Sequence, residues 1–215
     1  MADVGNVEAY IAEEFQWFHR HPELSYEEAE TTKRIRASLE RAGIRILDLP
    51  LKTGLVAEIG AGETIVALRS DIDALPIEEQ TDLPYRSEHA GRMHACGHDS
   101  HVAMLLGAAQ ILNEVKAELR GTVRLLVQPA EEVATGALDM LRGGALNGVS
   151  AIYGAHVWGN FDAPLIDVTP GSRMACCDKF TIEVEGVAAH ASAPHLGVDA
   201  ITVSAAIINN LQQCA

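Results

Sequence analysis

The sequence lacks several features that mark particular functional classes. It has no basic run interleaved with aromatic residues, and its net charge is −14, which argues against binding to nucleic acid or to an anionic membrane surface. No apolar run is long enough to span a bilayer. The first residues also lack the basic region and apolar stretch of a secretory signal. We therefore expect neither a nucleic-acid partner nor a membrane partner.

Cysteine is scarce, and its distribution does not suggest a disulfide framework. The four cysteines are Cys96, Cys176, Cys177 and Cys214. Two of them are adjacent in the chain and another lies among histidines, which is a poor pattern for paired bridges. With no secretory signal, this pattern predicts a reducing, cytoplasmic location.

A hydrophobic content of 48% predicts a sizeable core rather than disorder.

The most informative segment is 93–101, with the sequence Met-His-Ala-Cys-Gly-His-Asp-Ser-His. The apolar residues that follow it repeat with helical spacing: Val102, Leu105, Leu106, Ala109 and Leu112. The polar cluster therefore lies in a loop that enters a helix. Cys96 and His98 are side-chain types that bind borderline-soft divalent ions. We expect the helix N-terminus to lower the pKa of the thiol. Alone, the pair would suggest a buried cysteine beside a surface histidine; the polar surroundings favour a metal site instead.

Helical and strand patterns alternate along the first 170 residues, which predicts an α/β fold. Helices are expected near 6–19, from a capping box at Ser25 and Glu28 to about residue 42, and from the polar cluster to about residue 119. Strands are expected at 44–49, 54–59, 64–68, 121–127 and 151–154.

Three of these strands run into side chains that can bind metal or carry protons. They are followed by Asp71 and Asp73, by Glu131 and Glu132, and by His156. Open α/β sheets place their chemistry at the carboxyl ends of strands. Each has a simpler interpretation. Asp71 and Asp73 could cap the turn before Pro76, Glu131 and Glu132 could be a solvated acidic pair at a helix start, and His156 could be a core histidine. The recurrence favours one shared site, in which the aspartates orient a ligand histidine.

The pattern changes near residues 170–172. Apolar and polar residues alternate over 180–185, which predicts a half-exposed strand, and 200–211 predicts an apolar helix. The loop between them contains His190, which a surface position would explain equally well. We predict a metal-binding domain at 1–172 and the beginning of a second domain at 173–215.

These segments, in this order, resemble the di-metal amidohydrolases of the aminoacylase and carboxypeptidase type, within the zinc-peptidase superfamily. The branch that they resemble most contains hippurate hydrolases, N-acyl-amino-acid amidohydrolases and plant auxin-conjugate hydrolases. The matching motifs are His19-x-His21-Pro22-Glu23-Leu24-Ser25, Arg69-x-Asp71-x-Asp73-Ala74-Leu75-Pro76-Ile77, Met93-His94-Ala95-Cys96-Gly97-His98-Asp99, Gln128-Pro129-Ala130-Glu131-Glu132, Gly154-Ala155-His156-Val157 and Gly186-x-x-Ala189-His190-Ala191.

The resemblance implies two divalent metal ions, with zinc or manganese favoured over nickel or cobalt. It implies that the metal ligands are Cys96, His98, Glu132 and His156. It also implies that Glu131 is the general base, that Asp73 orients a ligand, and that His190 reaches the scissile carbonyl from a lid domain. Peptidase relatives have a metal-binding histidine where this chain has Asp71.

The implied fold is a mostly parallel-sheet di-metal exopeptidase domain, followed by the start of an α+β ferredoxin-like lid and dimerisation domain. Relatives supply a further late histidine ligand and more lid strands, which these 215 residues do not contain. The resemblance therefore implies that the catalytic domain is incomplete here, and that the intact protein is a homodimer through its lid.

The implied activity is metal-assisted hydrolysis of the amide bond of an N-acyl amino acid. Two alternatives remain open from the sequence. One is a thiol hydrolase that uses Cys96 and His156. The other is an inactive fragment or a binding protein that keeps the fold without turnover.

Overall fold

The computed structural model describes residues 4–174, 180–211 and 213. It separates into two compact units, of which one extends to Asp167 and the other begins at Val168. We predicted a boundary between residues 172 and 173, and the roles of the units as catalytic domain and lid stay predictions. Within the described residues Cys96 is a free cysteine. The other three cysteines, Cys176, Cys177 and Cys214, lie outside the described residues.

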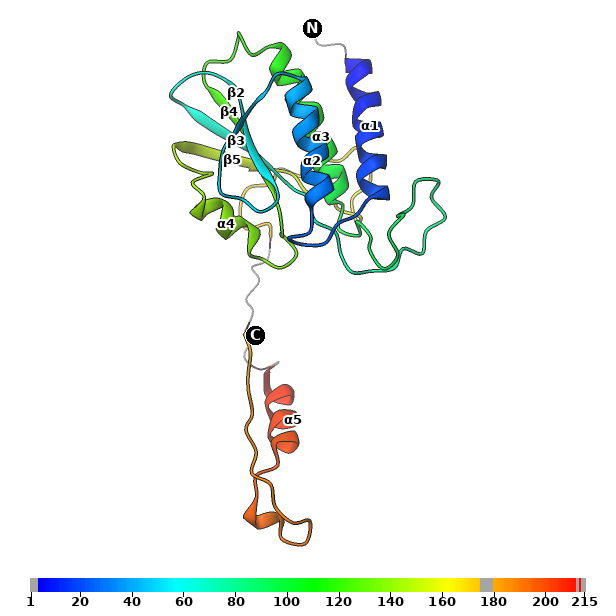
Figure 1. Ribbon diagram of the computed structural model, residues 1–215, viewed down its shortest axis with the longest axis vertical. Helices are drawn as coiled ribbons and strands as arrows, with labels where there is room; N and C mark the ends of the chain where they lie inside the picture. The colour runs from blue at the N-terminus through cyan, green and yellow to red at the C-terminus, as the bar shows by residue number, and fades with distance from the viewer. Residues whose placement is uncertain (1–3, 175–179, 212, 214–215) are drawn as a thin grey trace. The chain divides into compact units, whose positions relative to one another are not determined.

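The first unit is an α/β fold built on a five-stranded sheet with the order β1-β2-β4-β3-β5 (Figure 1). The strands are β1 (Arg45–Leu47), β2 (Leu55–Gly60), β3 (Ile65–Asp71), β4 (Thr122–Gln128) and β5 (Val149–Gly154). Strand β3 is parallel to β4 and to β5, whereas β2 is antiparallel to β1 and to β4. The described sheet is therefore mostly parallel, with β2 running against the other strands, and the predicted fold class is confirmed.

Helices cover both faces of this sheet (Figure 1). They are α1 (Val4–Arg20), α2 (Ala29–Arg41), α3 (His98–Glu114) and α4 (Gly136–Arg142). The larger core packs Phe18 of α1, Ile35 of α2 and Leu106 of α3 against one face of the sheet, which contributes Leu125 of β4. The smaller core packs Met140 of α4 with Val56, Ala67 and Leu126. Adjacent strand residues such as Leu125 and Leu126 thus enter different cores, because successive side chains alternate between the faces of a sheet.

The predicted capping box at Ser25 and Glu28 is wrong. Helix α2 begins at Ala29, and its preceding residue Glu28 makes no side-chain capping hydrogen bond. The Ser25 hydroxyl instead donates to Asp73 at 2.6 Å. The side chains of Ser25 and Glu28 both form hydrogen bonds to residues distant in sequence, and these bonds replace the local capping bonds. Helix α3 also ends before the predicted residue 119, since the chain leaves helical geometry at Val115 (φ −100°, ψ 16°).

The second unit contains the predicted helix, α5 (Ala200–Leu211), and a short 3₁₀ turn, η1 (Pro194–Leu196). The strand predicted at 180–185 is wrong: these residues form no strand, and the nearest pairing is an isolated bridge between Val187 and Val198. Alternation alone does not make a strand, because a strand also requires a neighbour for its backbone groups, and among the described residues 180–185 have none. The ferredoxin-like lid stays a prediction.

Among the helices of the described residues, we find none with the length and apolar character needed to cross a membrane.

Ile35 tests how far the larger core determines stability. Its side chain is fully buried in α2, within the larger core that also includes residues of α1, α3 and the sheet. We expect Ile35→Ala to lower the free energy of unfolding by about 2–5 kcal/mol, because the substitution removes buried methyl groups and leaves a cavity. Arg36→Ala, on the exposed side of the same helix, should change it by less than about 0.5 kcal/mol. Urea denaturation of both variants measures the difference. Equal effects would contradict this core assignment.

Candidate metal centre

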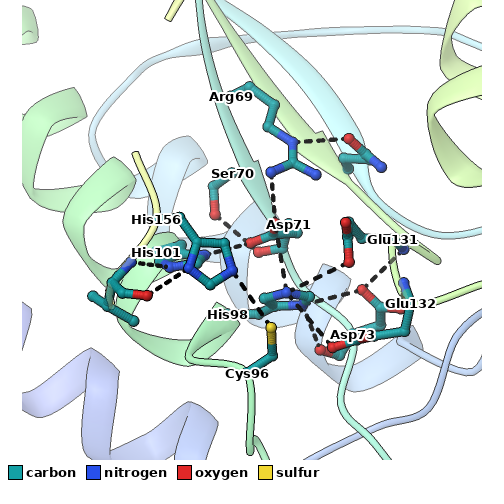
Figure 2. Close-up of polar contacts among 12 residues, drawn as sticks. Arg69, Ser70, Asp71, Asp73, Cys96, His98, His101, Glu131, Glu132 and His156 are labelled. Carbon is teal, nitrogen blue, oxygen red and sulfur yellow. Dashed lines mark hydrogen bonds and ion pairs between the residues drawn. The ribbon is translucent and has the colours of Figure 1, made fainter. Parts of the chain in front are cut away.

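Three neighbouring strand ends bring the predicted site residues to one edge of the sheet. In the parallel part of the sheet, Asp71 of β3 lies opposite Gln128 of β4, and Arg69 lies opposite Gly154 of β5. The segments that follow these strands carry Asp73, Glu131 with Glu132, and His156. The loop into α3 brings Cys96 and His98 to the same place (Figure 2). The structure therefore brings together the seven residues that the sequence placed at strand ends and in the polar loop (Figure 2): Asp71, Asp73, Cys96, His98, Glu131, Glu132 and His156.

The turn into α3 depends on a glycine. Gly97 precedes the helix with φ +99°, a left-handed conformation that L side chains adopt at a cost. A Cβ atom at this position would lie 2.3 Å from Cγ2 of Val157. The glycine thus lets the loop pass close to the segment after β5, with Cys96 on one side of it and His98 on the other.

His98 is the centre of the site and is fully buried. Its Nδ1 donates to the backbone oxygen of Asp73 at 2.9 Å, which leaves Nε2 to face the carboxylates. Nε2 lies 3.6 Å from Oδ2 of Asp71, 3.7 Å from Oε2 of Glu131 and 3.7 Å from Oε1 of Glu132. These separations exceed those of hydrogen bonds.

Two of these buried atoms have no hydrogen-bond partner: Nε2 of His98 and Oε1 of Glu132. Buried polar atoms are otherwise almost always paired. An imidazole nitrogen and a carboxylate oxygen that converge without a hydrogen bond between them are suited to a shared cation. The donor set thus fits a divalent ion on the geometry of the chain itself.

Cys96 and His156 complete the candidate donor set. Sγ of Cys96 lies 3.4 Å from Nε2 of His156, and His156 in turn contacts the Val157 oxygen through Nδ1 at 2.6 Å. Donor atoms of Cys96, His98 and His156 lie within 4.8 Å of one another, as do those of His98, Glu131 and Glu132. His98 belongs to both groups, but its one free ring nitrogen can bind a single ion, so a second ion would depend on the other donors.

His101 lies in the site, but both of its ring nitrogens already form hydrogen bonds within the chain. Its Nδ1 donates to Oδ1 of Asp71 at 2.6 Å, and its Nε2 accepts from the Val157 N–H at 2.9 Å. It therefore connects β3 to the segment after β5 rather than presenting a free nitrogen. Sequence reasoning assigned His101 no role. The available signal was its spacing of three residues after His98, which places both on one face of α3.

Asp73 does more than the predicted orientation of a histidine. Besides its contacts with His98, its carboxylate accepts the backbone N–H groups of Glu131 and Glu132, both at 3.0 Å. It also accepts the Ser25 hydroxyl at 2.6 Å. One buried side chain thus positions both the histidine and the acidic pair.

The charges around the site shift the pKa values of Asp71 and Cys96 in opposite directions. Burial opposes the ionisation of Asp71, but the hydrogen bond from His101 and the neighbouring His98 and Arg69 lower its pKa to about 2. Burial and the adjacent Glu132 raise the pKa of the Cys96 thiol to about 12. The predicted lowering of this pKa by the helix N-terminus is therefore wrong without a cation. A thiol that resists ionisation also disfavours the thiol hydrolase alternative, whereas a bound cation would deprotonate it.

The two glutamates differ in environment. The Glu131 side chain is 39% exposed and the Glu132 side chain 19%. Burial, together with repulsion from Glu131 and Asp73, raises the pKa of Glu132 despite the attraction of His98. Glu132 is therefore the member of the pair that gains more from a cation, and Glu131 the member open to solvent.

His190 lies in the second unit. It is exposed, and its Nδ1 lies 2.8 Å from the Ser192 hydroxyl. Its action on a substrate carbonyl stays a prediction.

Comparison with known proteins agrees with this arrangement. The model of Peptidase family M20/M25/M40 matches residues 67–214, a range that includes most of β3, all of β4, β5 and α3, and all the candidate donors. The chain belongs to this peptidase family.

Relatives of this M20 chain have related names. It is 51% identical over 197 residues to an N-acetylcysteine deacetylase from Bacillus subtilis, covering 90% of this chain and 52% of that protein. It is 39% identical to an N-acyl-L-amino acid amidohydrolase from Geobacillus stearothermophilus, covering 90% and 53%. The chain thus spans about half the length of these curated relatives.

One solved structure is that of a dinuclear metal-binding peptidase of the M20 family from Bacillus subtilis. This M20 chain is 52% identical to it, with a TM-score of 0.71, over 73% of this chain and 45% of that one.

Next to the candidate metal centre, this M20 chain buries a separate charged cluster around His19. Nδ1 of His19 contacts Oδ2 of Asp99 at 2.6 Å, and its Nε2 contacts Oε1 of Glu79 at 3.2 Å. The cluster joins the end of α1 to the first turn of α3 and to the long loop after β3. The hydrogen bond to Asp99 raises the pKa of His19 against the opposing effect of burial, with a further contribution from Glu79.

This cluster predicts a pH dependence of stability. The folded pKa of His19 lies above its ordinary value of 6.5, so its stabilising contribution is complete below about pH 6.5 and is lost as the pH rises through the folded pKa. We expect His19→Gln to lower the free energy of unfolding by about 3–5 kcal/mol near pH 6, because two buried carboxylates lose their cation. The difference from wild type should shrink towards pH 9.

Denaturant titrations between pH 5.5 and 9, with a chelator present, measure that difference without a contribution from bound metal. A gap between variant and wild type that widens with pH would contradict the assignment of a charged His19.

Proposed function

We propose that this M20-family protein is a metal-dependent amidohydrolase that cleaves the amide bond of N-acyl amino acids. The observation that carries the proposal is the convergence of Cys96, His98 and His156 with Glu131 and Glu132, in which buried donor atoms have no partner. The names of the two relatives support small N-acetyl and N-acyl amino acids as the substrate class, N-acetylcysteine among them.

Two divalent ions are proposed at the site, held by Cys96, His98, Glu132 and His156. The likeness to the dinuclear metal-binding peptidase from Bacillus subtilis supports two ions. Thiolate, imidazole and carboxylate ligands together suit zinc, and manganese is the next candidate. When bound, such ions polarise the amide carbonyl and lower the pKa of the attacking water.

Glu131 is proposed as the general base. It is more exposed than Glu132, so it can reach a water molecule and a substrate, while its backbone is held by Asp73. Its carboxylate would accept the proton of the attacking water and then donate it to the leaving amine. His190 is proposed to contact the scissile carbonyl from the lid, and the intact protein is proposed to be a homodimer through that lid.

The roles of the adjacent glutamates can be separated by substitution. We expect Glu131→Gln in the full-length protein to lower kcat by about 10²–10⁴-fold while the metal content stays near that of wild type. Glu132→Gln is the matched control, and it should lower the metal content because it removes a ligand oxygen. Hydrolysis of N-acetyl-L-cysteine and of hippurate gives the rates, and elemental analysis gives the metal. A Glu131→Gln variant with most of its activity would remove Glu131 as the base.

A chelator distinguishes the proposed chemistry from a thiol mechanism. We expect dialysis against a chelator to abolish hydrolysis, and added zinc or manganese to restore it, since the donor set is built for a cation. A thiol-alkylating reagent applied to the metal-loaded protein should act slowly if metal covers Cys96. Activity that survives metal removal but not alkylation would instead support the thiol hydrolase.

A further inference from the structure

The acidic pair lies on a turn with an unusual backbone. Residues 129–135 connect β4 to α4 and carry Glu131 and Glu132. Two alanines of this turn adopt left-handed backbone angles, Ala130 with φ +49° and Ala134 with φ +57°. Such angles are uncommon for residues with a side chain and persist where surrounding contacts impose them. The contacts that impose this conformation therefore also set where Glu131 points.

Glu28 makes one of these contacts, with the backbone of Ala130. It is fully buried at the start of α2, and its Oε1 accepts the backbone N–H of Ala130 at 2.8 Å. Its Oε2 accepts the Thr53 hydroxyl at 2.6 Å. Both partners are neutral, so the carboxylate is buried at a cost that hydrogen bonds only partly offset. Because burial of this carboxylate costs free energy, we expect Glu28 to have a role other than packing.

Glu28 and Asp73 hold the turn together. The three successive N–H groups of Ala130, Glu131 and Glu132 donate to these two buried carboxylates. The carbonyl of Ala130 accepts from the Gly136 N–H at 3.2 Å. The peptide units on either side of the acidic pair are thus fixed, and little freedom is left for the Glu131 backbone.

The support for Glu28 is itself rigid. The Gly54 N–H donates to the Thr32 hydroxyl of α2 at 2.9 Å, so the segment that carries Thr53 is attached to the same helix as Glu28. A Cβ atom on Gly54 would lie 2.4 Å from the Val127 oxygen and 2.6 Å from Cδ of Pro129. The start of α2, the segment before β2 and the turn after β4 are therefore in direct contact.

We propose that Glu28 is a positioning residue for Glu131: it fixes the backbone of Ala130 and so directs the base and the adjacent ligand Glu132 towards His98. This inference rests on the proposed function for the role of Glu131. Glu28 touches neither substrate nor metal in this proposal and acts only through the turn.

The test compares Glu28→Ala with Glu28→Gln in the full-length, metal-loaded protein. Alanine removes both hydrogen bonds, and we expect kcat to fall about 10–100-fold with KM changed less than about threefold, because misplacing a catalytic group by about 1 Å has an effect of this size. Zinc affinity, measured by chelator competition, should fall about tenfold, since Glu132 shares the turn. Glutamine can accept from Ala130 and donate to Thr53, so it should restore kcat and zinc affinity to within about threefold of wild type.

Ile35→Ala is the matched control, because Ile35 is buried in α2, the helix that follows Glu28, and its core cluster includes no residue of the turn. It should lower the melting temperature as Glu28→Ala does, yet keep kcat and zinc affinity at a temperature well below that transition. If Glu28→Ala behaves like this control, or if Glu28→Gln is as defective as Glu28→Ala, the positioning role is overturned.

Thr53→Val provides a milder variant in case Glu28→Ala does not fold. It removes one partner of Glu28, and a loss of kcat between those of wild type and Glu28→Ala supports the proposal, whereas an unchanged kcat contradicts it. If the wild-type protein hydrolyses no N-acyl amino acid, the proposed function fails, and zinc affinity alone still decides whether Glu28 positions the turn.

Discussion

The arrangement of the site depends on the hydrogen bonds that the Asp73 carboxylate accepts. This side chain is almost completely buried, and it receives the Ser25 hydroxyl and the N–H groups of Glu131 and Glu132 while Oδ1 lies 3.3 Å from Nδ1 of His98. Burial disfavours its charge, but the hydrogen bonds from His98, Ser25 and the two backbone groups lower its pKa below the ordinary value. An ionised, immobile carboxylate therefore connects the ends of β3 and β4 to the loop that enters α3.

Around this anchor the chain concentrates negative charge that its own cations only partly balance. Arg69 donates to Asp71 at 2.6 Å, and His101 donates to the same carboxylate. The consequence is seen at Glu132 and Cys96, whose pKa values are raised by burial and by neighbouring carboxylates. Metal sites have this character, because ligands that repel one another in the free chain are stabilised together when a cation is present. Because these groups repel one another, the proposed ligands need firm positioning, to which the turn at Gly97 and the buried Glu28 contribute.

Much of the candidate site could be predicted from sequence because its members lie at the ends of strongly patterned elements. An apolar strand that ends in Asp71 or precedes Glu131 is a local signal, and parallel neighbours bring such ends together. The roles of Glu28 and His101 could not be predicted in this way. Glu28 fits a capping box in sequence, yet its hydrogen-bond partners are 25 and 102 residues away, and no local rule contains such distances. The alternation over 180–185 misled for the opposite reason, since a period of two describes a strand only when a partner strand is present.

The sequence by itself determined the α/β class, the approximate positions of the helices and strands of the first unit, and the chemical identity of the residues that could bind metal. These depend on periodicity and on residue type, which short segments already contain. The tertiary structure alone decided that β2 runs against its neighbours, that His98 faces three carboxylates at once, and that Ser25 and Glu28 support the acidic turn instead of capping a helix. Those facts depend on which residues, distant in sequence, come into contact when the core forms. A buried carboxylate must be hydrogen-bonded, and its donors are the groups that the fold places beside it.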